Sequence, residues 1–402
     1  MKILMQFGEA LGADRLLEVD DVTFCVPCPY PASFIADIEF DSMDALFSWS
    51  DLASEKTFDD IPKVAARRCS ALAGTNPSKE YMEYIGFKDP RYNEGAEAVH
   101  DYYRKIGVND GRTCAPQLVG HLASKGEHCV CGESSQVIFL NSVFGARVNC
   151  QGLLAAGCAA MVRRIPNFGM HIDENRMGTH LVKVDKIPKE LYEWDLMGLY
   201  IGRRVGIGVP VLEMNVPFVT MDQHKSLGAS MTTSGQVDLY HIIGLTPEAG
   251  TYELAFGTNT PKEVIHYGAE EEEHMRREMD WATDENVDMV LLGCPHLSVF
   301  QIRDIAEMIE GRTCKAKLVI MTAQMVLEQA RINGDAQKIE AAGGFILTET
   351  CPPMLQMWPD NVHVLATDSG KMAYYVPGTR PDVQIHMGSM KHCIDAAVTG
   401  KW

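Results

Sequence analysis

The stretch that decides the fold of this chain is Val287-Asp288-Met289-Val290-Leu291-Leu292-Gly293-Cys294-Pro295-His296. Its first half is an apolar run without regular polar alternation, and its second half is a turn with a thiol and a proline. Comparable runs begin at Lys317, Gly344 and Val362, and each leads into a turn and then an amphipathic stretch. Such runs are typical of strands buried on both faces of a parallel sheet. They predict an α/β fold with a doubly wound parallel sheet over residues 285–402.

In sheets of this type, ligands bind beyond the carboxyl ends of the strands. Cys294, Cys351 and the turn Ser369-Gly370-Lys371 each follow one of the apolar runs. We therefore expect two thiols and a turn of small residues to meet at one edge of the sheet.

The whole chain has 402 residues, of which 46% are hydrophobic, so two or three domains with sizeable cores are expected. We divide it into a mixed α/β region (1–110), a central α/β domain for substrate and cofactor (111–284) and the C-terminal βα-repeat domain (285–402). The formal net charge of −18 argues against nucleic-acid binding and against an anionic membrane surface.

The cellular setting is predicted to be the cytoplasm. The segment 1–9 is too short for a signal peptide, and acidic residues follow within a few positions. No apolar run reaches the ~18 residues of a membrane span. In a reducing compartment the 12 cysteines are free, buried, metal-bound or catalytic. Cys25 and Cys28 have the spacing of a metal or redox pair, but no second pair of this kind follows.

Residues 113–149 are unusually rich in small and polar side chains around the run 136–140, which has a strand-like pattern. Arg and Asn side chains offer hydrogen-bond donors in the geometry that a carboxylate needs. The alternative is an ordinary polar loop with a surface arginine. Further along, His171, Glu174 and Arg176 either bind substrate or merely pair with each other. The candidate substrate-binding residues are Ser134, Ser135, Asn141, Ser142, Arg147, Asn149, Asn175 and Arg176.

Gly202, Gly206 and Gly208 do not form a dinucleotide-binding fingerprint, because Pro210 follows where a helix should begin.

Three cysteines lie beside prolines in predicted turns: Cys114, Cys294 and Cys351. Proline fixes a turn and helps to aim a neighbouring thiolate. Three thiolates can hold an iron–sulfur cluster and leave one iron open to a substrate oxygen. From the spacing alone, the alternative interpretation is that the three cysteines are buried small apolar side chains.

Motifs spread over nearly the whole chain resemble those of the aconitase X family, specifically its catalytic large subunit. They include Gly12-Ala13-Asp14-Arg15, Thr113-Cys114-Ala115-Pro116, Gly132-Glu133-Ser134-Ser135, Asn141-Ser142-Val143-Phe144-Gly145-Ala146-Arg147-Val148-Asn149, Asn167-Phe168-Gly169-Met170-His171, Gly293-Cys294-Pro295-His296, Thr350-Cys351-Pro352 and Ser369-Gly370-Lys371.

The resemblance implies a hydro-lyase with an iron–sulfur cluster, 4Fe–4S or 2Fe–2S, held by Cys114, Cys294 and Cys351. It implies a fold like the first three domains of aconitase around a central cleft. The substrate is expected to be a small hydroxy acid, with cis-3-hydroxy-L-proline and mevalonate 5-phosphate as candidates. The residues expected to take part in catalysis are His171, His296, Ser369 and Lys371, with one of the two histidines relaying a proton.

The family also has a small swivelling domain that carries a catalytic serine, and no such domain is recognised in this chain. The resemblance therefore implies a small-subunit partner. Two alternatives remain open: a small-acid-binding protein whose thiols bind zinc or nothing, and a subunit without catalysis.

Some segments depart from the family pattern. Residues 23–30 replace a segment that usually contains His and Gly, and Cys131 stands where many members have an aromatic residue. Neither candidate substrate can therefore be assumed. A phosphate-bearing substrate needs basic residues near the cleft, for which Arg203, Arg204 and Lys225 are the candidates.

Overall fold

The structure is a computed structural model, and it describes residues 1–24, 63–73, 78–86, 103–351, 359 and 361–402. The C-terminal part forms a five-stranded sheet in the order β12-β11-β10-β13-β14, with all neighbouring strands parallel. Its strands are β10 (Met289–Leu297), β11 (Lys317–Thr322), β12 (Gly344–Thr348), β13 (Val364–Thr367) and β14 (Gln384–Met387). The predicted doubly wound sheet is confirmed.

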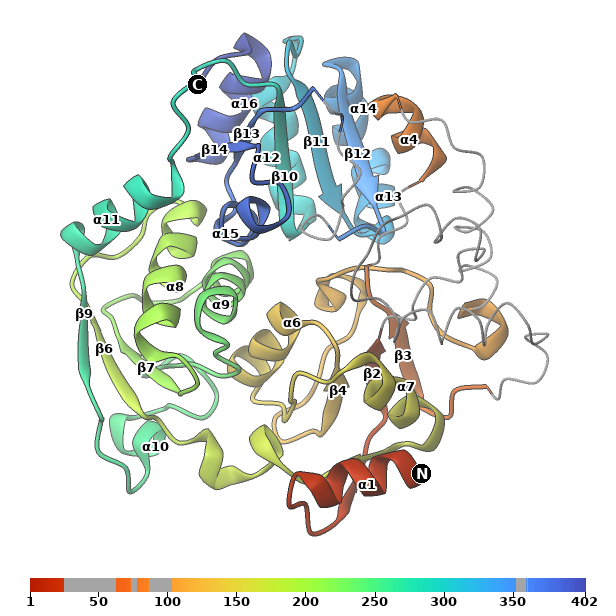
Figure 1. Cartoon of the computed structure of the whole chain (residues 1–402), viewed down its shortest axis with the longest axis vertical. Coiled ribbons are helices and arrows are strands. Elements are labelled where there is room, and N and C mark those ends of the chain that lie inside the picture. Colours follow the sequence, from red (N-terminus) through yellow and green to blue (C-terminus); the bar gives the residue numbers. More distant parts are fainter. Residues whose placement is uncertain (25–62, 74–77, 87–102, 352–358, 360) are drawn as a thin grey trace.

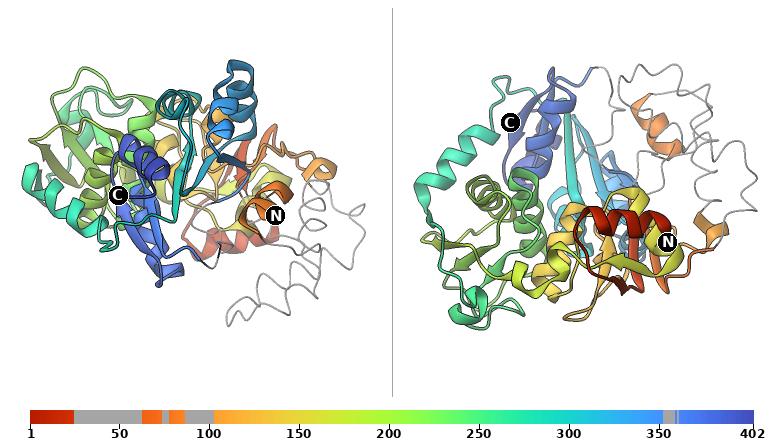
Figure 2. Two further views of the ribbon diagram at one scale, coloured as in Figure 1. Left: turned by 90° about the horizontal axis from the view of Figure 1, so that it is seen from above. Right: turned by 60° about the horizontal axis from the view of Figure 1, so that its bottom comes forward.

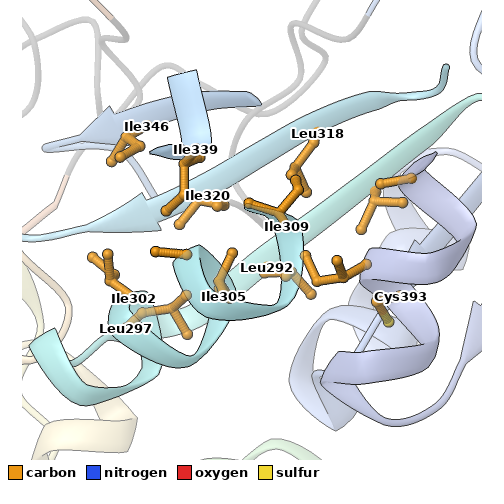
Figure 3. Close-up of a cluster of buried hydrophobic side chains, with 14 of the residues drawn as sticks. Leu292, Leu297, Ile302, Ile305, Ile309, Leu318, Ile320, Ile339, Ile346 and Cys393 are labelled. Carbon is orange, nitrogen blue, oxygen red and sulfur yellow. The ribbon is translucent and has the colours of Figure 1, made fainter. Parts of the chain in front are cut away.

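Helices cover both faces of this sheet (Figure 1), and Figure 3 shows the apolar cluster on the face that carries α12. One face packs on α12 (Val299–Ile309), α13 (Gln324–Asn333), α14 (Asp335–Ala341) and α16 (Met390–Thr399). The other face packs on α4 (Lys79–Ile85), α8 (Leu191–Val205), α11 (Ala269–Met279) and α15 (Gly370–Thr379). Every residue of β10 is buried, which explains why its sequence shows no polar alternation.

A second sheet has four parallel strands in the order β8-β7-β6-β9. They are β6 (His180–Val184), β7 (Pro210–Glu213), β8 (His241–Ile242) and β9 (Val264–Tyr267), with α9 (Met221–Gly235) and α10 (Tyr252–Phe256) beside them. α8 and α9 pack closely because Gly202 has no side chain: a Cβ atom there would lie 2.3 Å from the carbonyl oxygen of Met231. Gly202, which belongs to the rejected dinucleotide motif, thus allows close helix packing.

The N-terminal part contains a three-stranded parallel sheet in the order β3-β2-β4. Its strands are β2 (Asp21–Phe24), β3 (Arg68–Ala71) and β4 (Cys129–Cys131); β1 (Leu16–Glu18) pairs with β5 (Arg164–Pro166) in antiparallel fashion. α1 (Lys2–Ala10) and α7 (Leu153–Val162) contribute to the apolar core beside this sheet. β3 and β4 belong to one sheet, although they lie on either side of residue 110 in the sequence. The division of the chain at residues 110 and 284 stays a prediction.

One predicted element is wrong. Residues 136–140, expected to be a strand, lie in helix α6 (Ser134–Phe139) and at the start of the π-helical segment η3 (Leu140–Phe144). α6 is buried from Ser135 to Phe139, so its sequence carries no polar face and resembles a buried strand.

The three α/β parts surround a common centre, where α6 packs on α9 and α9 packs on α15 (Figures 1 and 2). Short 3₁₀ segments lie between them: η2 (Pro116–Val119), η4 (Gly169–His171) and η5 (Asp173–Arg176). No helix within the described residues is long and apolar enough to cross a membrane.

Candidate active site

The three proline-adjacent thiols meet at the centre of the molecule. Cys294 lies in β10, Cys351 follows β12, and Cys114 lies in the turn before η2. All three are buried, and Cys114 packs against Cys351. The backbone N–H of His296 donates to the Sγ atom of Cys114 at 3.3 Å. Segments that are far apart in the sequence thus deliver three thiols to one place.

The position of Cys294 depends on a local irregularity of β10. The pairing of β10 with β11 shifts register between Leu292 and Leu297. Gly293 has φ +109°, and a Cβ atom there would lie 2.2 Å from the carbonyl oxygen of Met321. Only glycine fits this position, so the strand leaves its regular path just before the thiol.

Burial dominates the electrostatics of the thiols. It raises the pKa of Cys114 to about 11. Burial also raises the pKa of Cys294 well above its ordinary value; Lys371 opposes this rise, and the nearby Cys351 and Cys114 thiols add to it. Without a bound cation the protonated thiols are therefore favoured.

The donor set fits an iron–sulfur cluster. Within the described part of the chain, no three His, Cys, Asp or Glu side chains are arranged to hold a single metal ion. A cluster needs a wider set, because its thiolates bind different irons. Three converging buried thiols with a nearby ammonium group agree with a cluster better than with one zinc ion.

His296 connects the thiol-bearing segments. Its Nδ1 atom lies 2.9 Å from the hydroxyl oxygen of Thr113, and its Nε2 atom lies 2.7 Å from the carbonyl oxygen of Thr350. Burial lowers the pKa of His296 to about 4, so the ring is neutral near pH 7. Since a carbonyl oxygen only accepts, Nε2 carries the proton and Nδ1 accepts from Thr113.

Lys371 is the buried cation beside the thiols. Its Nζ atom lies 2.8 Å from Oε1 of Glu133, the N-cap residue of α6. The same oxygen accepts a 2.7 Å hydrogen bond from the Ser135 hydroxyl. Burial by itself lowers the pKa of Lys371, but the carboxylate of Glu133 and the thiols of Cys294 and Cys351 raise it on balance. The ammonium form is therefore held at the junction of α6 and α15.

Ser369 is the N-cap residue of α15. Its hydroxyl donates to the carbonyl oxygen of Cys294 and accepts from the backbone N–H of Met372 at 3.1 Å. Beside it lies a cavity of about 20 Å³, which has room for one water molecule. The lining includes Cys294, Ser369, Asp195, Asp368 and Lys225.

The cavity wall holds two buried carboxyl groups. Burial raises the pKa of Asp195 to about 8 and that of Asp368 to about 6. Oδ1 of Asp195 accepts from the Ser230 hydroxyl at 2.5 Å and from the Gly370 N–H at 3.1 Å. Lys225 donates to the carbonyl oxygen of His296 at 3.0 Å, so it joins α9 to the thiol region.

A second cluster of polar side chains, which includes several of the residues predicted to bind substrate, surrounds Arg176. Its guanidinium donates to Glu248 at 3.0 and 3.1 Å, to Oδ1 of Asn141 at 3.0 Å and to the carbonyl oxygen of Met170 at 3.0 Å. The Asn141 amide donates in turn to the carbonyl oxygens of Val148 and Asp238, each at 2.8 Å. Each nitrogen of the buried Arg176 side chain is thus used within the protein.

The remaining predicted residues lie around this network. Asn149 donates to the carbonyl oxygen of Phe168 and accepts from the N–H of Met170. Asn175 donates to the carbonyl oxygen of Gly169, and Ser142 accepts from the N–H of Tyr240. Arg147 forms an ion pair with the exposed Asp173, and Ser134 begins α6 next to Ser135.

His171 differs from these residues because one of its polar atoms is unused. Its Nδ1 atom lies 3.0 Å from Nδ1 of His128, whereas its Nε2 atom is buried without a hydrogen-bond partner. Burial lowers the pKa of His171 to about 3, so the ring is neutral near pH 7.

Sequence reasoning quoted Glu133 only as part of a motif and did not include Asp195 or Asp368 among the candidates. Glu133 could have been selected because it precedes two serines at a helix start. Asp195 could not, since its sequence neighbours are those of an ordinary amphipathic helix.

Comparison with known proteins agrees with this geometry. Models of the aconitase X first, second and third domains match residues 1–174, 178–277 and 287–399. The solved structure of Thermococcus kodakarensis aconitase X in its holo-form superposes with a TM-score of 0.80 at 27% identity, covering 98% of this chain and 94% of that one.

Two kinds of characterised relatives match the sequence. The phosphomevalonate dehydratase large subunit of Thermococcus kodakarensis is 30% identical over 93% of this chain and 89% of that protein. The corresponding protein of Methanothermobacter thermautotrophicus is 34% identical over 94% and 89%. The cis-3-hydroxy-L-proline dehydratase of Pseudomonas aeruginosa is 32% identical over 77% of this chain but only 54% of that protein.

Fold and site together define an aconitase-type hydro-lyase, the class to which these dehydratases belong. The chain belongs to the aconitase X family. The predicted family and the aconitase-like fold are therefore confirmed, whereas the individual roles of the site residues stay predictions.

Proposed function

We propose that this chain is the large subunit of an iron–sulfur-dependent dehydratase that removes water from a small hydroxy acid. The observation that carries the proposal is the meeting of Cys114, Cys294 and Cys351, buried beside Lys371. In this proposal the three thiolates hold the cluster, which supplies a Lewis acid for the hydroxyl group that leaves. The donor arrangement favours this function over a zinc-binding protein.

Lys371 is proposed to bind the anionic end of the substrate. It is a buried cation whose charge acts on Cys294 and Cys351, and Glu133 fixes its position. Arg147 is the second candidate for a substrate carboxylate, because its ion pair reaches an exposed partner. Arg176 is assigned instead to holding Asn141 and Glu248 in place.

Dehydration removes a proton from one carbon and a hydroxide from its neighbour, and the hydroxide leaves as water once it is protonated. His171 is proposed to contact the reacting groups, because its Nε2 atom has no partner in the protein. Both ring nitrogens of His296 are already used. The base that takes the carbon-bound proton is proposed to come from a small-subunit partner, since the relatives matched over most of their length are named large subunits.

The substrate choice is between mevalonate 5-phosphate and cis-3-hydroxy-L-proline. Arg203 and Arg204 pair with Glu278 and Glu263, and they lie about two helical turns beyond Asp195, which lines the cavity. These two arginines therefore do not support a phosphate site beside the thiols. The match nevertheless covers most of the length of the phosphomevalonate dehydratase large subunits, which favours the phosphorylated substrate. Both substrates are therefore to be assayed.

The test is anaerobic reconstitution of the full chain with iron and sulfide, followed by addition of the small subunit and an assay of water elimination from both substrates. Replacing Cys294 by Ser is expected to abolish the cluster absorbance and the dehydratase activity together. Replacing Cys393 by Ser is the matched control, because Cys393 is a buried thiol of α16 and lies outside the three segments that carry Cys114, Cys294 and Cys351. Full activity of C294S, or no iron bound to the wild-type chain, contradicts the proposal.

A further inference from the structure

We propose that His296 is a positioning residue that fixes the spacing of the three thiols, rather than the proton relay of the reaction. The inference rests on the proposed function of the thiols and deepens it. It starts from an arrangement of side chains around Cys114, Cys294 and Cys351 that the sequence does not reveal.

The residues that precede two of the cysteines are paired across space. Thr113 precedes Cys114 and Thr350 precedes Cys351, and the ring of His296 lies between the two threonines. Its Nδ1 atom accepts from the Thr113 hydroxyl, and its Nε2–H donates to the Thr350 carbonyl oxygen. His296 itself comes two residues after Cys294 in the same strand. One imidazole therefore contacts all three cysteine-bearing segments.

A second pair reinforces the first, one residue further from the thiols. The guanidinium of Arg112 contacts the carboxylate of Glu349 at 2.6 Å, and these residues precede Cys114 and Cys351 by two positions. Glu349 has φ +66°, a left-handed conformation that residues other than glycine rarely adopt. The ion pair holds this strained turn in place, as expected where a backbone conformation serves a site.

The backbone of His296 completes the arrangement. Its N–H donates to Sγ of Cys114 at 3.3 Å, and its carbonyl oxygen accepts from Lys225 at 3.0 Å. An N–H directed at sulfur stabilises a thiolate more than a thiol. The contacts thus aim Cys114 as well as joining its segment to those of Cys294 and Cys351.

A proton relay needs a ring nitrogen that faces the reacting atoms. Both nitrogens of His296 are occupied by protein groups, and the side chain is fully buried. Residues that hold metal ligands in position are not ligands themselves, but replacing them commonly lowers metal affinity by about 10–100-fold. His296 holds the three thiol-bearing segments in this way.

The test measures how fast each thiol of the full chain reacts with isotopically labelled iodoacetamide, followed by peptide mapping. Replacing His296 by Ala is expected to raise the labelling rates of Cys114 and Cys351 about tenfold, because the freed segments open locally. The rate at Cys393, buried in α16, is expected to stay unchanged, which separates local release from general unfolding. Iron affinity on reconstitution is expected to fall about 10–100-fold.

Two further substitutions separate positioning from proton transfer. The amide of H296Q can still donate to the Thr350 carbonyl oxygen, so it should restore much of the slow labelling and of the iron binding. Thr113→Val keeps the shape and removes the hydroxyl, so it should reproduce part of the effect of H296A in a chain that folds. If His296 were a proton relay, H296Q would be as inactive in dehydration as H296A. The labelling rates and iron binding of T113V would then equal those of the wild type.

The matched control is His241→Gln. His241 is also buried, and its Nε2 atom is also within hydrogen-bond distance of a backbone carbonyl oxygen, at 2.9 Å from that of Arg176. The thiols of the H241Q variant should be labelled at the wild-type rates. Wild-type labelling rates and iron affinity in both H296A and T113V would overturn the inference. If H296A releases the thiols but the wild-type chain binds no iron, the proposed function fails and the positioning role stands.

Discussion

The thiol region and the Arg176 region are both buried and polar, yet their side chains are used in opposite ways. Around Arg176, the guanidinium, the Asn141 amide and the Glu248 carboxylate satisfy one another. In the thiol region, His296, Ser369 and Lys371 donate to backbone carbonyl oxygens or to Glu133, and these contacts surround the three thiols. A network that closes on itself maintains a fold, whereas a network that surrounds reactive groups can present a site.

This contrast predicts that damage to the Arg176 region is felt first as lost stability. Arg176→Leu leaves the partly buried Glu248 carboxylate without its cation and removes the donors to Asn141. The expected loss is about 2–3 kcal/mol in the free energy of unfolding, measured by urea denaturation. Arg147→Leu is the control: because Asp173 is exposed, its loss should be at most about 1 kcal/mol. Equal losses in the two variants would remove the distinction between the regions.

The buried acid of the thiol region offers a second, pH-dependent contrast. Burial raises the pKa of Asp195 from 3.8 to about 8, so the folded state holds a proton that the unfolded state has lost between these values. Stability from this group is therefore present at low pH and falls as pH rises from about 4 to about 8.

Asp195→Asn keeps the oxygen that accepts from Ser230 and Gly370 but cannot ionise. The variant should gain stability relative to the wild type as pH rises, with the largest gain near pH 8. Thermal unfolding at several pH values measures this gain. A difference that stays constant from pH 5 to pH 8 contradicts the assignment of a protonated Asp195.

The smallest effect is expected at Ser369, which was predicted to be catalytic and caps α15 in the structure. Ser369→Ala removes the acceptor for the Met372 N–H and the donor to the Cys294 carbonyl oxygen. A loss of about 1 kcal/mol is expected from the cap. Ser369→Asp should recover that cap and leave the Cys294 carbonyl oxygen without its donor. If both variants bind iron as tightly as the wild type, Ser369 acts only as a cap.

The sequence was most informative where burial follows a simple pattern. The apolar runs at Met289 and Lys317 predicted strands, because strands covered on both faces need no polar positions. The same logic failed for residues 136–140, since a helix buried on all sides has no polar positions either. Length does not separate the two cases when the helix is this short.

The site was predicted unevenly for a related reason. The strand pattern suggested that Cys294 and Cys351 lie at one sheet edge, whereas Cys114 was singled out only by its neighbouring proline and by the family resemblance. Nothing local in the sequence distinguishes Lys371, which lies beside the thiols, from Arg176, which is satisfied by Glu248. That distinction depends on partners from distant segments, which periodicity and spacing do not report.

The sheet order also has a consequence for how the protein is made. The central strand β10 carries Cys294, and its neighbour β13 is translated after Cys351. A nascent chain that contains Cys114 and Cys294 therefore still lacks both Cys351 and one of the two strands that flank β10. Under the proposed function, the three thiols could complete a metal site only after residue 367 has been translated. The order of the strands would then place cofactor loading after the synthesis of nearly the whole chain.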